Sequence, residues 1–194
     1  MIRPLAEFSA HLTDTANLIG ASSPAEDVVF TGVAHSDKEV EAGDLFLAIS
    51  GTKVHGAEFI KNARAKGAVG VITDAQGAQI DSSLPTLVVN DVRAAGAHVA
   101  AKLFQYPTRD IASIGITGTN GKTTVTTLLH QIMSAAGRDS GLIGTVETRI
   151  GEEVIASKRT TPESSELQAL SAVMRERHMR NLVMEVSSHA ITLE

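Results

Sequence analysis

The stretch from Ile111 to Thr124 reads IASIGITGTNGKTT, and it decides which fold we expect. Residues 111–117 predict a strand. The glycine-containing turn 118–121 follows, and the helix predicted over 122–136 has apolar residues at i, i+3, i+4 and i+7 spacing. This order of strand, glycine turn and helix exposes consecutive backbone N–H groups at a helix N-terminus, where phosphate oxygens bind.

The turn carries the side chains that a bound nucleoside triphosphate and its metal ion need. Gly118 and Gly121 would let the backbone approach the phosphates closely. Lys122 would reach the terminal phosphates as a point charge, and the Thr123 hydroxyl would meet Mg²⁺. The spacing departs from the usual phosphate-binding loop, because Ile116 stands where a further glycine is expected. The alternative interpretation is a capped strand-to-helix turn with an exposed lysine.

A second stretch, LVMEVSSH at 182–189, predicts an apolar strand that ends in an acidic residue. The carboxyl ends of strands in open parallel sheets form the ligand crevice, and nucleotide sites place a metal-binding carboxylate there. We therefore expect Glu185 to share a metal ion with Thr123. His189 is a candidate second metal ligand, and Ser187 is a candidate substrate contact. A strand followed by an ordinary polar turn would give the same pattern.

The composition is that of an ordinary globular protein. The 194 residues are 43% hydrophobic and 20% charged, with a net charge of −5. Neither half is basic and aromatic residues make up only 3%, which argues against a nucleic-acid partner. We expect no signal peptide and no membrane span. Cysteine is absent, which excludes a disulfide framework or a thiolate nucleophile and fits a reducing, cytoplasmic compartment.

The chain is expected to fall into two segments, residues 1–108 and 109–194. In the first segment we predict strands over 43–49, 68–73 and 86–89, and helices over 57–66 and 92–106. Asp91 is the predicted N-cap of the second helix. In the second, after the phosphate-binding unit, we predict strands 142–150, 154–157 and 182–186, and a helix from Thr161 and Pro162 to about His178. Alternating strands and helices predict an α/β architecture with at least part of the sheet parallel.

Four patches of the sequence resemble the Mur ligase family. They are GITGTNGKTT at 115–124, RTTPE at 159–163, MEVSSHA at 184–190 and EAGDLFLAISG at 41–51. The last patch resembles the uridine-nucleotide domain of that family. RTTPE together with MEVSSHA is most similar to the MurE type, the UDP-N-acetylmuramoyl-tripeptide synthetases. The resemblance covers almost the whole chain but less than half of such an enzyme.

The resemblance implies an ATP-dependent ligase that forms an amide bond in a peptidoglycan precursor, with ATP and Mg²⁺ as cofactors. ATP would phosphorylate the D-Glu carboxylate of UDP-MurNAc-L-Ala-D-Glu. The amine of a diamino acid, diaminopimelate or lysine, would then attack the acyl phosphate. The sequence does not choose between these two amino acids or indicate an oligomeric state. We expect the chain to be an incomplete fragment that is inactive alone.

The resemblance also implies a fold and a set of site residues. The fold is a small uridine-nucleotide-binding α/β domain over 1–108, followed by the start of a P-loop, Rossmann-like parallel-sheet ATPase domain over 109–194. The residues implied to bind ATP are Gly118, Thr119, Asn120, Gly121, Lys122, Thr123 and Thr124. Those implied in catalysis are Lys122, Glu185 and His189, and those implied to hold the metal are Thr123, Glu185 and His189. Those implied to contact UDP-MurNAc-dipeptide are His35, Asp37, Thr52, Lys53, Val54, Thr160, Thr161 and Ser187.

Alternatives remain for parts of this set. The family usually has Asp-Ser-Arg before the GDLF strand, where this chain has Ser36, Asp37 and Lys38, so an exposed loop is the alternative there. Thr160 and Thr161 could instead cap a helix, and His55 and the other histidines are expected in surface or core roles. Rival functions are another Mur ligase, a folylpolyglutamate synthase-like ligase or a non-catalytic nucleotide-binding module. Thr123 argues against the second rival, which normally has glycine after the lysine.

Overall fold

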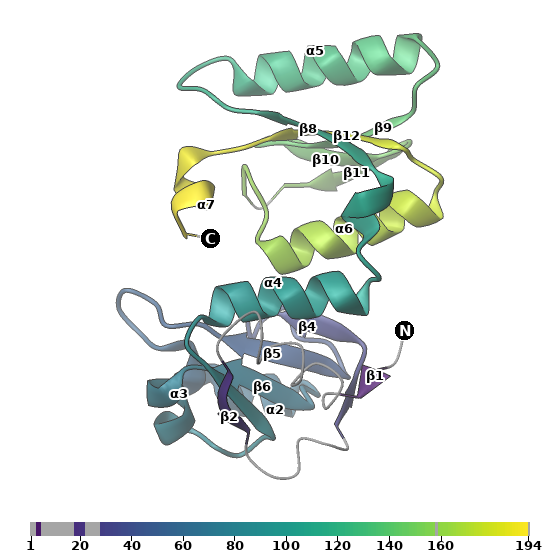
Figure 1. Cartoon of the computed structure of the whole chain (residues 1–194). Coiled ribbons are helices and arrows are strands. Elements are labelled where there is room, and N and C mark those ends of the chain that lie inside the picture. The colour runs from purple at the N-terminus through teal and green to yellow at the C-terminus, as the bar shows by residue number, and fades with distance from the viewer. Residues whose placement is uncertain (1–2, 5–17, 22–27, 158, 194) are drawn as a thin grey trace. The chain divides into compact units, whose positions relative to one another are not determined.

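The computed structural model of the chain forms two compact units, Met1–Leu103 and Phe104–Glu194 (Figure 1). It describes residues 3–4, 18–21, 28–157 and 159–193. Each unit has its own five-stranded sheet, and each sheet is packed against helices. The division falls five residues before the boundary that the sequence suggested at 108.

The sheet of the first unit is mostly parallel. Its strand order is β2-β7-β6-β5-β4, and β2 pairs antiparallel with β7 while the other neighbours are parallel. The strands are β2 (Leu18–Ala21), β4 (Gly32–Ala34), β5 (Asp44–Ala48), β6 (Gly70–Thr73) and β7 (Thr86–Val89). Every residue of β5 and β6 is buried, as expected for parallel strands covered on both faces. A separate short ladder pairs β1 (Arg3–Pro4) with β3 (Val29–Phe30).

Helices cover this sheet, and one of them was not predicted. The predicted helix over 57–66 is a 3₁₀ turn, η2 (Gly56–Phe59), followed by α2 (Ile60–Ala65). The unpredicted helix α3 (Ala75–Ile80) begins where Asp74 accepts a hydrogen bond from the Gly77 N–H at 2.8 Å. Helix α4 (Val92–Leu103) has the predicted cap, since Asp91 accepts from the Ala94 N–H at 3.0 Å.

The sheet of the second unit is mixed. Its order is β11-β10-β9-β12-β8, in which β9, β12 and β8 are parallel and β10 runs antiparallel to both of its neighbours. The strands are β8 (Ala112–Ile116), β9 (Ser140–Ile143), β10 (Glu147–Ile150), β11 (Glu153–Ala156) and β12 (Asn181–Glu185). The single strand predicted over 142–150 is therefore wrong. The chain reverses at residues 144–146, because the Gly144 N–H donates to the Glu147 carbonyl at 3.0 Å.

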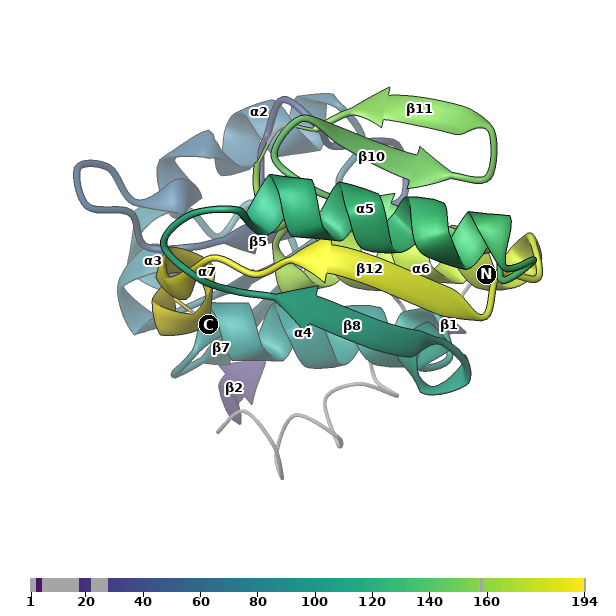
Figure 2. The same cartoon turned by 90° about the horizontal axis from the view of Figure 1, so that it is seen from above.

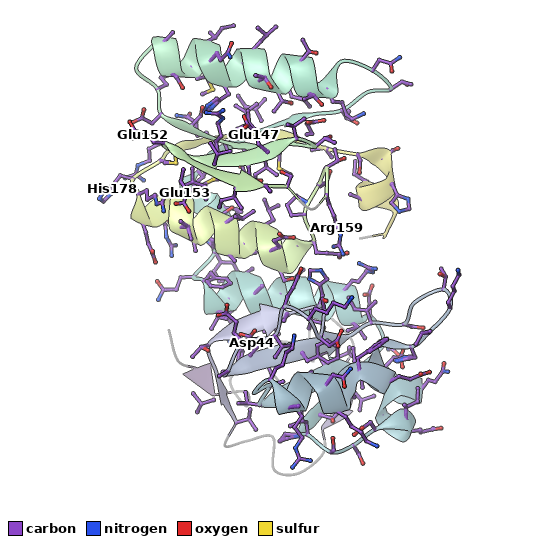
Figure 3. All side chains as sticks on the ribbon, turned by 180° about the vertical axis from the view of Figure 1, so that it is seen from behind. Asp44, Glu147, Glu152, Glu153, Arg159 and His178 are labelled. Atoms are coloured by element: carbon purple, nitrogen blue, oxygen red, sulfur yellow. The ribbon has the colours of Figure 1, made fainter. Side chains whose placement is uncertain are left out.

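Helix α5 (Lys122–Ala135) lies on one face of this sheet and α6 (Ser164–Glu176) on the other (Figures 1 and 2). The 3₁₀ turn η3 (Pro107–Asp110) leads into β8. The core between the sheet and α6 consists of Ile111, Ile143, Ile150, Met174, Met179, Leu182 and Met184. Glu147 and Glu153 lie on the β10–β11 hairpin (Figure 3), and Glu153 binds Arg177 just after α6 at 2.5 Å.

The apolar face predicted for α5 is only partly covered in the described part of the chain. Met133 is buried, as predicted, but Val125, Leu128 and Ile132 are 48%, 52% and 63% exposed. Strand β8 beside this helix is an edge strand, and its Ile114 is 37% exposed. Edge strands with apolar side chains are sites where further chain can pair. Among the described residues, the structure has no helix with the length and apolar character that a membrane span requires.

Candidate active site

Three loops of the second unit meet because three parallel strands lie side by side. Strands β9, β12 and β8 are neighbours with the same direction, so their carboxyl ends share one edge of the sheet. Figure 2 shows β12 and β8 side by side, with their arrowheads at the same end. The segments that follow them are 144–146, 186–187 and 117–121. The edge formed by strand carboxyl ends is where open α/β sheets bind ligands.

An open pocket of about 370 Å³ lies at this edge. It is lined by Thr119, Asn120, Gly121, Lys122, Thr123, Thr124, Thr145, Thr160, Glu185 and Ser187. All but one of these were predicted as site residues, and the exception is Thr145. Gly118, Thr161 and His189, which were also predicted, are not among the lining residues. The pocket thus brings together the two patches of the second unit that the sequence linked to phosphate and metal.

The glycine loop has the backbone that its sequence predicts. Gly118 and Gly121 have φ values of +144° and +81°, which residues with a Cβ rarely adopt. Gly121 stands directly before the first turn of α5, so the N–H groups at that N-terminus face the pocket. The Lys122 ammonium donates to the Gly118 carbonyl at 2.9 Å, which folds the lysine back over the loop. Lys122 also lines the pocket, so its charge lies beside this space.

Glu185 is a buried carboxylate at the end of β12, with only 1% of its surface exposed. Its Oε2 accepts from the Thr123 hydroxyl at 3.1 Å. The two residues expected to share a metal ion therefore lie in direct contact, and the shared metal stays a prediction. Its Oε1 accepts from the Thr145 N–H at 2.8 Å, and the Thr145 hydroxyl is 3.1 Å from Oε2. A buried charge needs such donors, because burial without them is costly.

The side-chain oxygen atoms at this edge are ligands of the kind that Mg²⁺ prefers. A hard cation of this kind binds through one or two carboxylates, with waters and phosphate oxygens completing its shell. Glu185 and the Thr123 hydroxyl supply such oxygens beside the phosphate loop. Within the described ranges there is no group of three or more His, Cys, Asp or Glu side chains that could hold a metal alone. His189 lies exposed on α7 (Ser188–Leu193), and its metal role stays a prediction.

Thr160 and Thr161 do not cap a helix. Helix α6 begins at Ser164, and its N-cap residue is Glu163, so the predicted start at Thr161 and Pro162 is wrong. The Thr161 hydroxyl instead donates to the Glu185 carbonyl at 3.0 Å and accepts from the Ser187 N–H at 3.0 Å. These bonds tie the segment before α6 to the end of β12, and they leave Thr160 facing the pocket.

The candidate uridine-side residues follow two adjacent parallel strands of the first unit. His35 and Asp37 come after β4, and Thr52, Lys53 and Val54 come after β5, so both segments lie at the same sheet edge. The side chains of residues 52–54 are exposed. Asp37 is not isolated there, since its Oδ2 accepts from the Asn62 amide at 3.2 Å.

His55 closes the loop that carries Thr52, Lys53 and Val54, and it is buried as a core residue. It bridges to Ser50, and its Nδ1 accepts from the Ala57 N–H at 3.0 Å. Its Nε2 lies 3.1 Å from both oxygens of Asp74, so we assign the ring proton to Nε2. Burial raises the pKa of Asp74, but hydrogen bonds from Gly77 and His55 outweigh burial and hold this pKa below its usual value.

The parallel strands, the glycine loop at a helix N-terminus and the strand-end carboxylate define a P-loop nucleotide-binding α/β fold. Two family models match the chain. Residues 30–105 match "Mur ligase family, catalytic domain", and residues 116–194 match "Mur ligase middle domain". The chain belongs to the Mur ligase family.

Curated relatives agree with this family. A protein of Streptomyces avermitilis named UDP-N-acetylmuramoyl-L-alanyl-D-glutamate–2,6-diaminopimelate ligase is 47% identical over 193 residues, which cover 98% of this chain and 38% of that protein. One of the same name from Halalkalibacterium halodurans is 45% identical over 158 residues, 81% of this chain and 32% of that protein. This chain therefore spans about 38% or less of the length of these relatives.

Solved structures support the same fold. A structure of a UDP-N-acetylmuramoyl-L-alanyl-D-glutamate–2,6-diaminopimelate ligase has a TM-score of 0.75 at 22% identity. The match covers all of this chain and 37% of that one. The MurF ligase of Thermotoga maritima in complex with ADP has a TM-score of 0.53 at 23% identity, covering 81% of this chain and 32% of that one. At such identities these structures support the fold alone.

Proposed function

We propose that the full-length protein is an ATP-dependent ligase that adds diaminopimelate to UDP-MurNAc-L-Ala-D-Glu through an acyl phosphate, in the cytoplasm. The observation that carries this proposal is the single pocket in which the glycine loop, Glu185, Thr160 and Ser187 meet. The relatives are named as diaminopimelate ligases, which supports this reaction over the reactions of the rival ligases. The same name favours diaminopimelate over lysine as the added amino acid.

The residues of the pocket have distinct roles in this reaction. The loop N–H groups and Lys122 would bind the phosphates of ATP and offset the charge on the phosphoryl group as it moves to the D-Glu carboxylate. Glu185 and Thr123 would hold Mg²⁺, which supplies further positive charge to the same oxygens. The burial of Glu185 and its hydrogen bond with Thr123 would hold these groups in place before substrate binds, so little reorganisation is needed during reaction.

Two parts of the substrate would each have their own binding residues in this proposal. Thr160 and Ser187 line the pocket and would contact the dipeptide portion. The first unit would bind the uridine nucleotide at the edge that carries His35, Asp37 and residues 52–54. In this proposal Lys53 faces the diphosphate, and the Asp37 carboxylate accepts from ribose or uracil, away from the phosphates.

Calorimetry on the full-length protein tests the substrate assignment. We expect UDP-MurNAc-L-Ala-D-Glu to bind, and Lys53→Ala to weaken binding about tenfold or more, because a hydrogen bond to a charged group contributes about 1.5–3 kcal/mol. Lys61→Ala is the matched control, since Lys61 is an exposed lysine on α2 outside the predicted loop. Equal dissociation constants for the two variants would remove Lys53 from the site, and an absence of binding to the folded protein would contradict the proposed substrate.

A further inference from the structure

The turn 144–146 is the part of the site that no sequence motif indicated. It follows β9, which lies beside β12 in parallel register with Ile143 opposite Met184. The turn therefore stands next to Glu185, one residue beyond the paired ends of the two strands. The bond from the Gly144 N–H to the Glu147 carbonyl keeps the turn tight and turns the chain into β10.

Thr145 contacts both oxygens of the Glu185 carboxylate. Its N–H donates to Oε1 at 2.8 Å, and its hydroxyl is 3.1 Å from Oε2 and 3.1 Å from the Thr160 hydroxyl. The Thr145 hydroxyl has one proton, and a carboxylate is the stronger of these two acceptors. The terminal torsion of a glutamate is otherwise broad, so contacts at both oxygens are what fix the plane of this carboxylate.

Gly144 also lies against the Glu185 carboxylate. A Cβ placed on Gly144 would lie 2.7 Å from Glu185 Oε1 and 3.5 Å from its Cδ. Any side chain at position 144 would therefore push the carboxylate out of its place. Its φ is not in the left-handed region, so close approach to Glu185 rather than backbone conformation accounts for the glycine.

We propose that Thr145 and Gly144 are positioning residues that orient the Glu185 carboxylate for a divalent cation bound together with the nucleotide. This inference rests on the proposed function, in which Glu185 holds Mg²⁺. Groups that orient a metal ligand typically change metal affinity by about 10–100-fold. In this proposal Thr145 acts through Glu185, as a positioning residue and not as a metal ligand.

The test measures Mg²⁺-dependent binding of ADP, without turnover. ADP is titrated into the full-length protein by calorimetry at a series of Mg²⁺ concentrations, and the Mg²⁺ concentration that gives half of the affinity gain is determined. The variants are Thr145→Val, which removes the hydroxyl, Thr145→Ser, which retains it, and Gly144→Ala. Thr126→Val is the matched control, because the buried Thr126 hydroxyl on α5 has no hydrogen-bond partner in the described structure.

We expect Thr145→Val and Gly144→Ala to raise the required Mg²⁺ concentration about tenfold or more, with metal-free ADP binding unchanged. Thr145→Ser and Thr126→Val should stay close to the wild type, and melting temperatures verify that each variant is folded. If Thr145→Val and Thr145→Ser both match the wild type, Thr145 has no positioning role. If the wild type itself shows no effect of Mg²⁺ on ADP binding, the metal role of Glu185 fails, and this inference fails with it.

Discussion

Replacing Lys122 with alanine in the full-length protein should lower kcat by about 10²–10³-fold, the usual cost of one preorganised group that stabilises transition-state charge. The Lys122 ammonium already lies over the glycine loop, 2.9 Å from the Gly118 carbonyl, so its loss removes a fixed positive charge. Binding of the uridine nucleotide should stay unchanged, since the residues proposed for it belong to the other unit.

Steady-state kinetics with saturating ATP and substrate measure this loss. Lys61→Ala serves as the control for removing one exposed lysine and should retain full kcat. If Lys122→Ala kept more than about a tenth of kcat, a loss below ~1.4 kcal/mol in activation free energy, the phosphate-binding role of Lys122 would be wrong.

Glu185→Gln should have an effect of similar size through the metal ion. The substitution keeps the shape of the side chain but removes its charge. The new NH₂ group replaces one of the two carboxylate oxygens, so it faces either the Thr145 N–H or the hydroxyl groups near Oε2. The site would lose the buried carboxylate charge that attracts Mg²⁺, and the hydrogen bonds around this side chain would have to rearrange. We expect kcat to fall at least about 10²-fold and the Mg²⁺ requirement to rise.

Measuring kcat at a series of Mg²⁺ concentrations separates the loss of kcat from the rise in the Mg²⁺ requirement. Glu152→Gln, in the exposed turn of the β10–β11 hairpin (Figure 3), removes one carboxylate from the same unit and should change neither quantity. A Glu185→Gln protein with the wild-type Mg²⁺ dependence would show that this carboxylate does not hold the metal.

The strand, glycine loop and helix of residues 112–135 were predictable because their signals are local. The apolar run before Gly118, the glycines and the periodic apolar residues after Lys122 each specify one element, and β8, the loop and α5 match them within a residue or two. That Thr123 and Glu185 lie close together could also be predicted, since Glu185 ends β12 and Thr123 follows the loop after β8, and these two strands pair in parallel.

The remaining features depend on contacts between residues far apart in the chain. Thr145 reaches Glu185 across 40 positions only because β9 pairs with β12, and a threonine in a turn carries no signature of that role. The same turn was missed because 142–150 is largely apolar or β-prone and contains one inconspicuous glycine. Thr161 and Pro162 have the sequence of a helix start, but the hydrogen bonds of Thr161 to β12 and Ser187 delay α6 to Ser164.

The central claim, a ligase that works through an acyl phosphate, is tested most directly by oxygen transfer. UDP-MurNAc-L-Ala-D-Glu labelled with ¹⁸O in the D-Glu carboxylates is incubated with the full-length protein, ATP, Mg²⁺ and diaminopimelate, with lysine in a parallel reaction. If a carboxylate oxygen attacks the γ-phosphorus of ATP and the amine then displaces phosphate, one labelled oxygen leaves with each phosphate as the amide forms. We predict one ¹⁸O per phosphate released and one tripeptide product per ATP, with diaminopimelate preferred. Amide formation with unlabelled phosphate, or ATP hydrolysis without any amide product, would contradict the account.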